Sequence, residues 1–176
     1  WNGGAVGLRF DTRQITIAGV LGAVTVVLGT TGLGFVPVAT PAGAATFMHL
    51  PVVLAGMLGG PAVGAAVGAI FGFTTLRFLG DIRVVMPARL LMGPIAYLVY
   101  AGLERKTWSV PLAAAVGSIV NTVCTLGLAV AFGYIPLAGK TGALAIAVVQ
   151  GIPEALVAAV LLTPIVLAVT KTMRRA

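Results

Sequence analysis

The chain has 176 residues, of which 59% are hydrophobic and only 9% are charged, and its net charge at pH 7 is +7. A soluble domain carries about 25% charged residues, so this composition cannot cover a water-soluble globule and indicates an integral membrane protein. It excludes soluble enzymes, zinc fingers, disulfide scaffolds and disordered tails. The basic residues fit the flanks of membrane spans, so we expect no nucleic-acid partner.

Six apolar runs follow one another along the chain, separated by short segments. They cover Ile15–Phe35, His49–Leu58, Pro61–Leu79, Val84–Leu103, Val110–Phe132 and Gly142–Val169. A span needs about 20 residues, lipid requires every backbone group to be paired internally, and no strand alternation is visible. We therefore predict an all-α integral membrane protein with six transmembrane helices in one bundle.

Two of the runs depart from the usual span. The second is short, so it is either a tilted or re-entrant helix or begins earlier, near Ala44. The sixth is long and contains Pro153 and Pro164, which predict a bend. With no room for a soluble domain, we expect a single transmembrane domain over residues 1–176, of which residues 1–10 are either disordered or a processing remnant.

Basic residues near the run ends predict the orientation. An even number of spans places both termini on one side, and seven basic residues gather there: Arg9, Arg13, Arg105, Lys106, Lys171, Arg174 and Arg175. The opposite side has four: Arg77, Arg83, Arg89 and Lys140. Cytoplasmic loops carry the excess of Lys and Arg, so we expect both termini in the cytoplasm. The minority cations either contact lipid headgroups and pair with Asp81, or form an outward-facing anion site.

Small residues recur at four-residue spacing, which places them on one helix face. Gly60, Gly64, Gly68 and Gly72 form one such stripe, which favours tight internal packing. The first run carries two overlapping pairs, Ala18 with Gly22 and Gly19 with Ala23. These four residues either pack internally or form a docking face for another membrane subunit, and the spacing alone does not decide between the two.

Polar residues inside a membrane are functional candidates, because hydrocarbon makes them costly. Counting about 1.5 Å per helical residue, we place Arg89, Asn121, Gln150 and Glu154 in the middle and outer half of the bilayer. One interpretation is an ion pair between Arg89 and Glu154 that joins two helices. The other is a pocket for a small polar ligand, to which Thr122 and Thr125 add hydroxyl groups. The two interpretations can coexist.

The segment Gly34–Phe47 is the longest external loop, and its apolar residues suggest a cover over a cavity rather than a free loop, the alternative being a position among the headgroups. His49 follows it and is either an interfacial hydrogen-bonded residue or a ligand contact. No second histidine or acidic cluster supports a metal site. No phosphate-binding loop is present, and Ser118 and His49 should lie too far apart for hydrolysis, so we expect neither a cofactor nor enzyme activity.

Several segments resemble one known family. Thr46–Ala65 (TFMHLPVVLAGMLGGPAVGA) and Phe71–Thr75 (FGFTT) are similar to the second and third helices of S components, the substrate-binding subunits of energy-coupling factor (ECF) vitamin transporters. Pro87–Tyr97 (PARLLMGPIAY) is similar to their fourth helix. Gly117–Thr122 (GSIVNT) and Gly151–Ala155 (GIPEA) are similar to the fifth and sixth. The pantothenate-type branch is the nearest in pattern.

The resemblance implies a subunit in a prokaryotic plasma membrane that captures a vitamin from outside and docks on a transmembrane coupling subunit with two ATPase subunits. It places the vitamin site at the outward end, and our substrate-binding candidates are Thr46, His49, Arg89, Asn121, Gln150 and Glu154. It also implies that the small-residue motif of the first helix contacts the coupling subunit. The alternatives are a stand-alone channel or facilitator and a structural membrane adaptor without a ligand.

Overall fold

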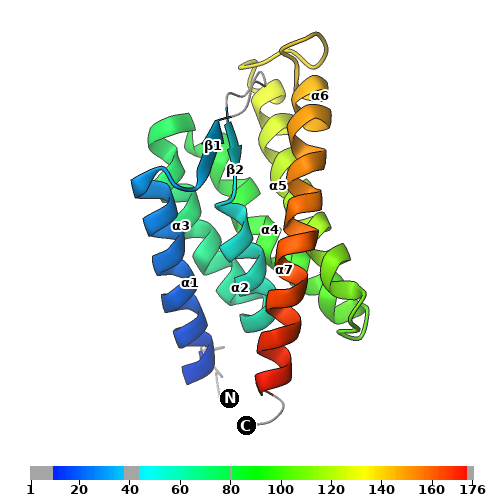
Figure 1. Ribbon diagram of the computed structural model, residues 1–176. Helices are drawn as coiled ribbons and strands as arrows, with labels where there is room; N and C mark the ends of the chain where they lie inside the picture. Colours follow the sequence, from blue (N-terminus) through cyan, green and yellow to red (C-terminus); the bar gives the residue numbers. More distant parts are fainter. Residues whose placement is uncertain (1–9, 38–43, 80, 174–176) are drawn as a thin grey trace, which may run out of the picture.

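The computed structural model describes residues 10–37, 44–79 and 81–173. Helices make up almost all of this part of the chain (Figure 1). In chain order, its elements are α1 (Thr12–Thr31), β1 (Phe35–Pro37), β2 (Ala44–Thr46), α2 (His49–Gly59), α3 (Pro61–Leu79), α4 (Ile82–Gly102), α5 (Ser109–Ala131), α6 (Ala143–Ile146), the π-helical segment η1 (Ala147–Gly151) and α7 (Ile152–Met173).

The predicted apolar runs coincide with the helices, because each run is long enough to form a helix and ends at a glycine, a proline or a polar turn. The sixth run forms one continuous rod from α6 through η1 to α7. Gly32 ends α1 in the left-handed conformation, at φ 77°, which glycine adopts without strain. The helical assignment is therefore confirmed in all six runs, except that α1 ends at Thr31, whereas Phe35, the predicted end of the first run, lies in β1.

The predicted all-α class is confirmed, and one short element stands beside the helices. β1 and β2 form a two-stranded antiparallel ribbon in which Phe35 pairs with Thr46 and Pro37 with Ala44. The ribbon lies inside the predicted cover, Gly34–Phe47, of which residues 38–43 fall outside the described part of the chain. Pairing satisfies backbone groups that no helix would satisfy at this position.

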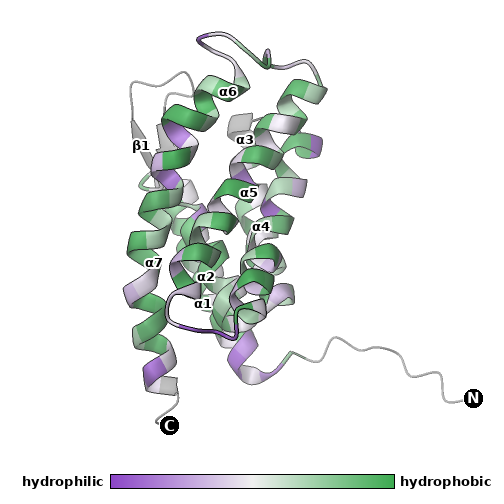
Figure 2. Ribbon diagram, turned by 90° about the vertical axis from the view of Figure 1, so that its right-hand side faces the viewer, coloured by the Kyte–Doolittle hydropathy of each residue, from purple (hydrophilic) through white to green (hydrophobic). Residues whose placement is uncertain are grey.

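Within the described residues, four helical segments are long and apolar enough to cross a membrane: Thr12–Thr31, Ile82–Gly102, Ser109–Ala131 and Ala143–Thr172. Hydrophobic residues dominate the helices along their length (Figure 2). α1 begins and α7 ends at the same end of the bundle (Figure 1). These features establish a membrane bundle, while the count of six spans and the cytoplasmic position of the termini stay predictions.

The short helix α2 lies at the centre of the bundle and packs against α1, α3, α4, α5 and α7. With 11 residues it is about 16 Å long, roughly half of the hydrocarbon thickness. Protein surrounds it, and two side chains from α1 cover its last carbonyl groups. Arg13 donates to the Leu58 carbonyl oxygen at 3.2 Å and Gln14 to that of Gly59 at 2.9 Å. The carbonyl groups at the end of this short helix are thus hydrogen-bonded within the protein, although the helix is too short to reach both membrane surfaces.

Three glycines let α2, α3 and α4 approach with their backbones in contact. A Cβ on Gly64 of α3 would lie 2.8 Å from Gly56 Cα of α2 and 3.0 Å from Gly93 Cα of α4. A Cβ on Gly68, one turn further along α3, would collide with the carbonyl oxygen of Arg89. The glycine stripe of α3 is therefore a packing surface, as its spacing predicted, and it fixes the backbone position of Arg89.

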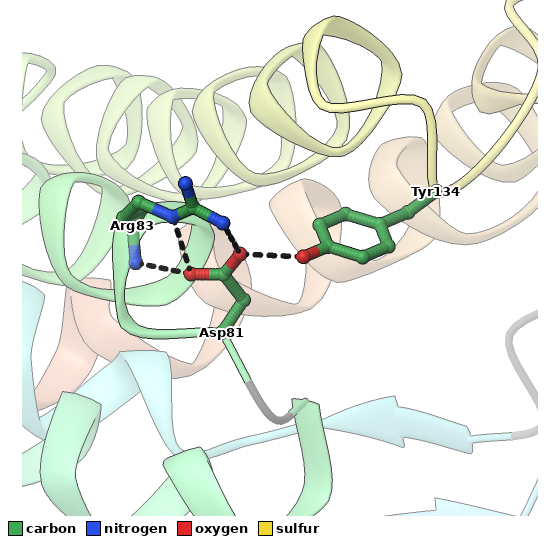
Figure 3. Close-up of polar contacts among 3 residues, drawn as sticks. All are labelled: Asp81, Arg83 and Tyr134. Carbon is green, nitrogen blue, oxygen red and sulfur yellow. Dashed lines mark hydrogen bonds and ion pairs between the residues drawn. The ribbon is translucent and has the colours of Figure 1, made fainter.

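A polar contact joins the α3–α4 turn to the loop after α5 at the opposite end from the termini (Figure 3). Asp81 accepts hydrogen bonds from the Arg83 side chain at 2.9 and 3.2 Å and from the Tyr134 hydroxyl at 2.6 Å. The Arg83 guanidinium also lies over the Phe132 ring, 4.7 Å from its centroid. The bonds from Arg83 and then Tyr134 hold the pKa of Asp81 well below its usual value. Because a lowered carboxyl pKa stabilises the contact above that pKa, the loops stay joined at neutral pH and separate only in strong acid.

Replacing Gly64 by valine tests the three-helix contact. The added side chain would force backbones apart, and overpacking of this kind costs about 1–3 kcal/mol. We expect a lower midpoint of thermal unfolding in detergent. Gly127→Val is the matched control, because Gly127 lies on α5 with nothing within 4 Å of the position of a Cβ. Equal midpoints for the two variants would contradict the contact.

Candidate functional site

Arg89 is the most deeply buried cation in the described part of the chain, with only 4% of its surface exposed. It projects from the second turn of α4. Its Nη1 donates to the Asn121 side-chain oxygen and, at 3.1 Å, to the Thr125 hydroxyl, both on α5. The guanidinium lies over the Phe71 ring of α3, 4.3 Å from the centroid. Three helices thus hold the charge with neutral groups and an aromatic face.

Glu154 is also buried, and it joins the middle of the α6–η1–α7 rod to the ribbon. Its Oε1 accepts the backbone N–H of Thr46 at 2.7 Å and the Gln150 side-chain amide at 3.2 Å. Glu154 stands in the first turn of α7, directly after η1 and Pro153. Proline lacks an N–H, which interrupts the regular helical ladder and accounts for a local π-helical turn.

His49 lies between these two groups. It is fully buried at the start of α2, near the backbone of Thr46 and Glu154 and within electrostatic range of Arg89. Within the described residues, Nε of Arg89 and the Ser118 hydroxyl lack a hydrogen-bond partner. The ring nitrogens of His49 approach the backbone of Thr46 and Glu154 but make no hydrogen bond of full geometry. Buried polar atoms are normally paired, and each unpaired one costs about 1–3 kcal/mol. In a site for a polar ligand, the atoms that bind the ligand have no protein partner. The unpaired atoms near these charged residues are therefore those expected of such a site.

The structure therefore brings all six predicted substrate-binding residues into one region, which we call the buried polar cluster. It consists of Thr46, His49, Arg89, Asn121, Gln150 and Glu154. Asn121 and Arg89 form one half, and Glu154 with Thr46 and Gln150 forms the other. His49 stands between the halves. The ligand-binding role of these residues stays a prediction.

The alternative of a direct Arg89–Glu154 ion pair does not hold in the described residues, where no such pair lies within 4.0 Å. The ion pairs present there join Asp81 to Arg83 and Glu104 to Lys106, each at 2.9 Å. Arg89 and Glu154 are close enough to influence each other electrostatically. The two charges thus face a common region without neutralising each other directly.

Sequence reasoning missed the role of Phe71. The sequence did contain a signal for this contact, because Phe71 lies between Gly68 and Gly72 on the glycine stripe of α3. A ring beside such a close helix contact can lie under a side chain of the neighbouring helix. It also missed the unpaired Ser118 hydroxyl, which lies one turn before Asn121 on α5. Within residues 10–37, 44–79 and 81–173, no group of three His, Cys, Asp or Glu side chains lies close enough together to hold a metal ion.

The two small-residue pairs of α1 point in different directions. Gly22 is buried, and a Cβ there would lie 2.9 Å from Ile70 of α3. Ala18 packs beside the buried cluster formed by α2 and α3. Gly19 and Ala23 are exposed, and a Cβ on Gly19 would meet nothing within 4 Å. Internal packing therefore accounts for Ala18 and Gly22, and the outward face of α1 carries Gly19 and Ala23.

Comparison with known proteins places the chain in a family. The model of the family described as "ECF transporter, substrate-specific component" matches residues 13–166. No curated protein matches the chain. Because the match covers most of the sequence, the chain belongs to this family: it is the substrate-specific subunit of an ECF transporter, a membrane protein and not an enzyme.

The bond between Glu154 and Thr46 predicts that α7 holds the ribbon in place. We expect Glu154→Ala to speed amide hydrogen exchange at Thr46 and through β2, because the Thr46 N–H loses its acceptor. Thr163→Ala is the control, since its hydroxyl bonds to Ala159 within the same helix. Unchanged exchange at Thr46 in the Glu154 variant would show that the ribbon is held by other contacts.

Proposed function

We propose that this ECF substrate-specific component captures a small vitamin with an acidic group, pantothenate being the leading candidate, from outside a prokaryotic cell. Transport inward would use a transmembrane coupling subunit and two ATPase subunits in the plasma membrane. The binding site is the buried polar cluster. The observation that carries the proposal is a buried guanidinium whose partners, in the described residues, are a neutral amide, a hydroxyl and an aromatic ring.

The chemistry of Arg89 supports an acidic ligand. A buried charge is costly unless it is paired and hydrogen-bonded. Arg89 keeps its Nε free of protein partners, and a guanidinium binds a carboxylate through parallel hydrogen bonds. A carboxylate of the vitamin would supply the direct ionic partner that Arg89 lacks among the described residues, while Asn121 orients the guanidinium from the other side.

The remaining cluster residues suit the polar part of the same molecule. Glu154 accepts hydrogen bonds, so with the Gln150 amide it can hold hydroxyl or amide N–H groups of a ligand. A neutral His49 offers one donor and one acceptor, and neither nitrogen makes a hydrogen bond of full geometry to the neighbouring backbone. Pantothenate has a carboxylate at one end and an amide and two hydroxyl groups elsewhere, which matches this order of groups.

The ribbon supports the role of the Gly34–Phe47 segment as a cover. The hydrogen bond from Thr46 to Glu154 attaches β2 to a site residue at 2.7 Å. Movement of the segment away from the bundle would break that bond, and a ligand held by Glu154 would favour the closed position. Capture and closure would then be coupled through one carboxylate.

Docking on the coupling subunit is assigned to the outward face of α1. Gly19 and Ala23 are exposed there, and small residues let another membrane helix approach closely. Ala18 and Gly22 lie on the inner side of α1. Their packing against α2 and α3 sets the direction in which the outward face points.

Substitution of Arg89 tests the site. We expect Arg89→Ala to weaken pantothenate binding about 10- to 100-fold, since a hydrogen bond to a charged group contributes about 1.5–3 kcal/mol. Isothermal titration of purified protein in detergent measures the affinity, and thermal unfolding checks that the variant is folded. Lys140→Ala removes an exposed cation instead and should bind like the wild type. Wild-type affinity in the Arg89 variant would remove Arg89 from the site.

Reconstitution in liposomes separates the proposed importer from a stand-alone channel or facilitator. We expect uptake of labelled pantothenate only when the coupling subunit, both ATPase subunits and ATP are present. Uptake by the purified chain alone would favour a facilitator. Failure to bind any vitamin tested would leave the adaptor interpretation.

The docking face has its own prediction. Gly19→Leu should leave vitamin binding unchanged but reduce ATP-driven uptake about tenfold or more, because a bulky side chain keeps the partner helix away. Gly127→Leu is the control, since Gly127 is an equally open helical glycine on α5. Equal uptake by both variants would exclude Gly19 from the docking face.

A further inference from the structure

Two grooves lie next to each other at the end of the bundle where α1 begins and α7 ends, far along the helices from the buried polar cluster. The first has a volume of about 510 Å³ and lies among the start of α1, the α2–α3 turn and the end of α4. The second has a volume of about 780 Å³ and lies between the α4–α5 turn and the end of α7. Tyr100, Arg105 and Thr170 line both, so we treat them together as the basal grooves.

Basic side chains from three parts of the chain line the basal grooves. They are Arg13, Arg105, Lys106 and Lys171, against the acids Asp11 and Glu104. Glu104 is already paired with Lys106 at 2.9 Å. Arg13 uses one nitrogen for the Leu58 carbonyl, and Arg105 contacts the Tyr97 hydroxyl at 3.5 Å. Each guanidinium has five N–H donors, so most of the donors of Arg13 and Arg105 are available to an anion.

Tyr100 gives the basal grooves a hydrogen-bond donor in addition to the basic side chains. It is 95% buried, and its ring packs in the core with Met57, Val110 and Leu162. It nevertheless lines both grooves, and its hydroxyl makes no hydrogen bond within the described residues. This oxygen is not among the fully enclosed unpaired atoms of the described residues, so it faces the grooves and has room for a partner. An acceptor seated in the grooves beside Arg105 would supply it.

The surroundings of the grooves favour a lipid as the source of that acceptor. Trp108 lines the second groove and is 55% exposed, and Tyr97 lines the first. Trp and Tyr mark the level of the membrane–water interface. Leu167 lines the second groove, and the exposed Val160, seven residues earlier on the same face of α7, continues the apolar surface toward the bundle centre. A molecule with an acidic head group and apolar chains fits this arrangement, in which basic groove residues are followed by aromatic and then apolar side chains.

We propose that the basal grooves bind the phosphate headgroup of an anionic phospholipid. Arg105 and Arg13 contact the phosphate, the Tyr100 hydroxyl donates to one of its oxygens, and the acyl chains run along α7. The N-terminal end of α3 begins at Pro61 in the wall of the first groove and adds its positive dipole. The bound lipid would hold α1, α4 and α7 together at the end of the bundle opposite the vitamin site.

Native mass spectrometry of the full chain in mild detergent tests the proposal, with phosphatidylglycerol as the anionic probe and phosphatidylcholine as the zwitterionic one. We expect one phosphatidylglycerol adduct that outcompetes phosphatidylcholine. Arg105→Gln should weaken it about fivefold, the effect of about one basic residue near a membrane surface. Tyr100→Phe removes only the hydroxyl and should weaken it less. Lys140→Gln removes the same charge at the other end and should leave it unchanged.

Each contrary result would point to a different role or occupant of the basal grooves. Equal retention of the two lipids, or full retention of phosphatidylglycerol by a folded Arg105→Gln variant, would overturn the proposal. Displacement of the lipid by millimolar inorganic phosphate would identify a soluble anion as the occupant and also overturn it. Variants that retain the lipid but lose ATP-driven uptake would assign the grooves to a partner protein instead. Vitamin binding by the same variants distinguishes all of these from a failure of the proposed function.

Discussion

The burial of a guanidinium among neutral partners is the constraint on which the site depends. Arg89 is nearly inaccessible, and its described contacts are Asn121, Thr125 and the Phe71 ring. Such a charge is stable only when every surrounding element is fixed, because a small shift would break its few hydrogen bonds. The glycine contacts provide that rigidity: Gly68 packs directly on the Arg89 carbonyl, and Gly64 and Gly93 bring α3 and α4 into backbone contact.

The short central helix α2 connects the two ends of the molecule. Its first residue, His49, lies in the buried polar cluster, next to the ribbon that Glu154 holds through Thr46. Its last carbonyl groups accept hydrogen bonds from Arg13 and Gln14, at the edge of the basal grooves. A helix that spans only about half of the bilayer thus leaves room for a polar site above it and a basic surface below it. The proposed vitamin site and the proposed lipid site are therefore separated along one axis.

Helix positions could be predicted from the sequence because apolar runs of sufficient length have one stable structure in lipid. The meeting of Arg89 with Asn121, and of Gln150 with Glu154, followed from depth and from four-residue spacing. The ribbon did not, since its pairing of Phe35 with Thr46 joins residues across a loop. Gly22 faces inward because Ile70 of α3 packs against it. The position of Phe71 under Arg89 depends on how closely α3 approaches α4. Contacts between remote segments are what spacing alone cannot supply.

The central claim is that the unpaired groups around Arg89 are completed by an acidic small molecule. Chromatography and mass spectrometry of small molecules released from the wild-type protein, purified gently from its native membrane, test it most directly. We expect one carboxylate-bearing compound in a ratio of about one to one with the protein, as for tight binding at a single site. A neutral or cationic compound recovered at that ratio would contradict it.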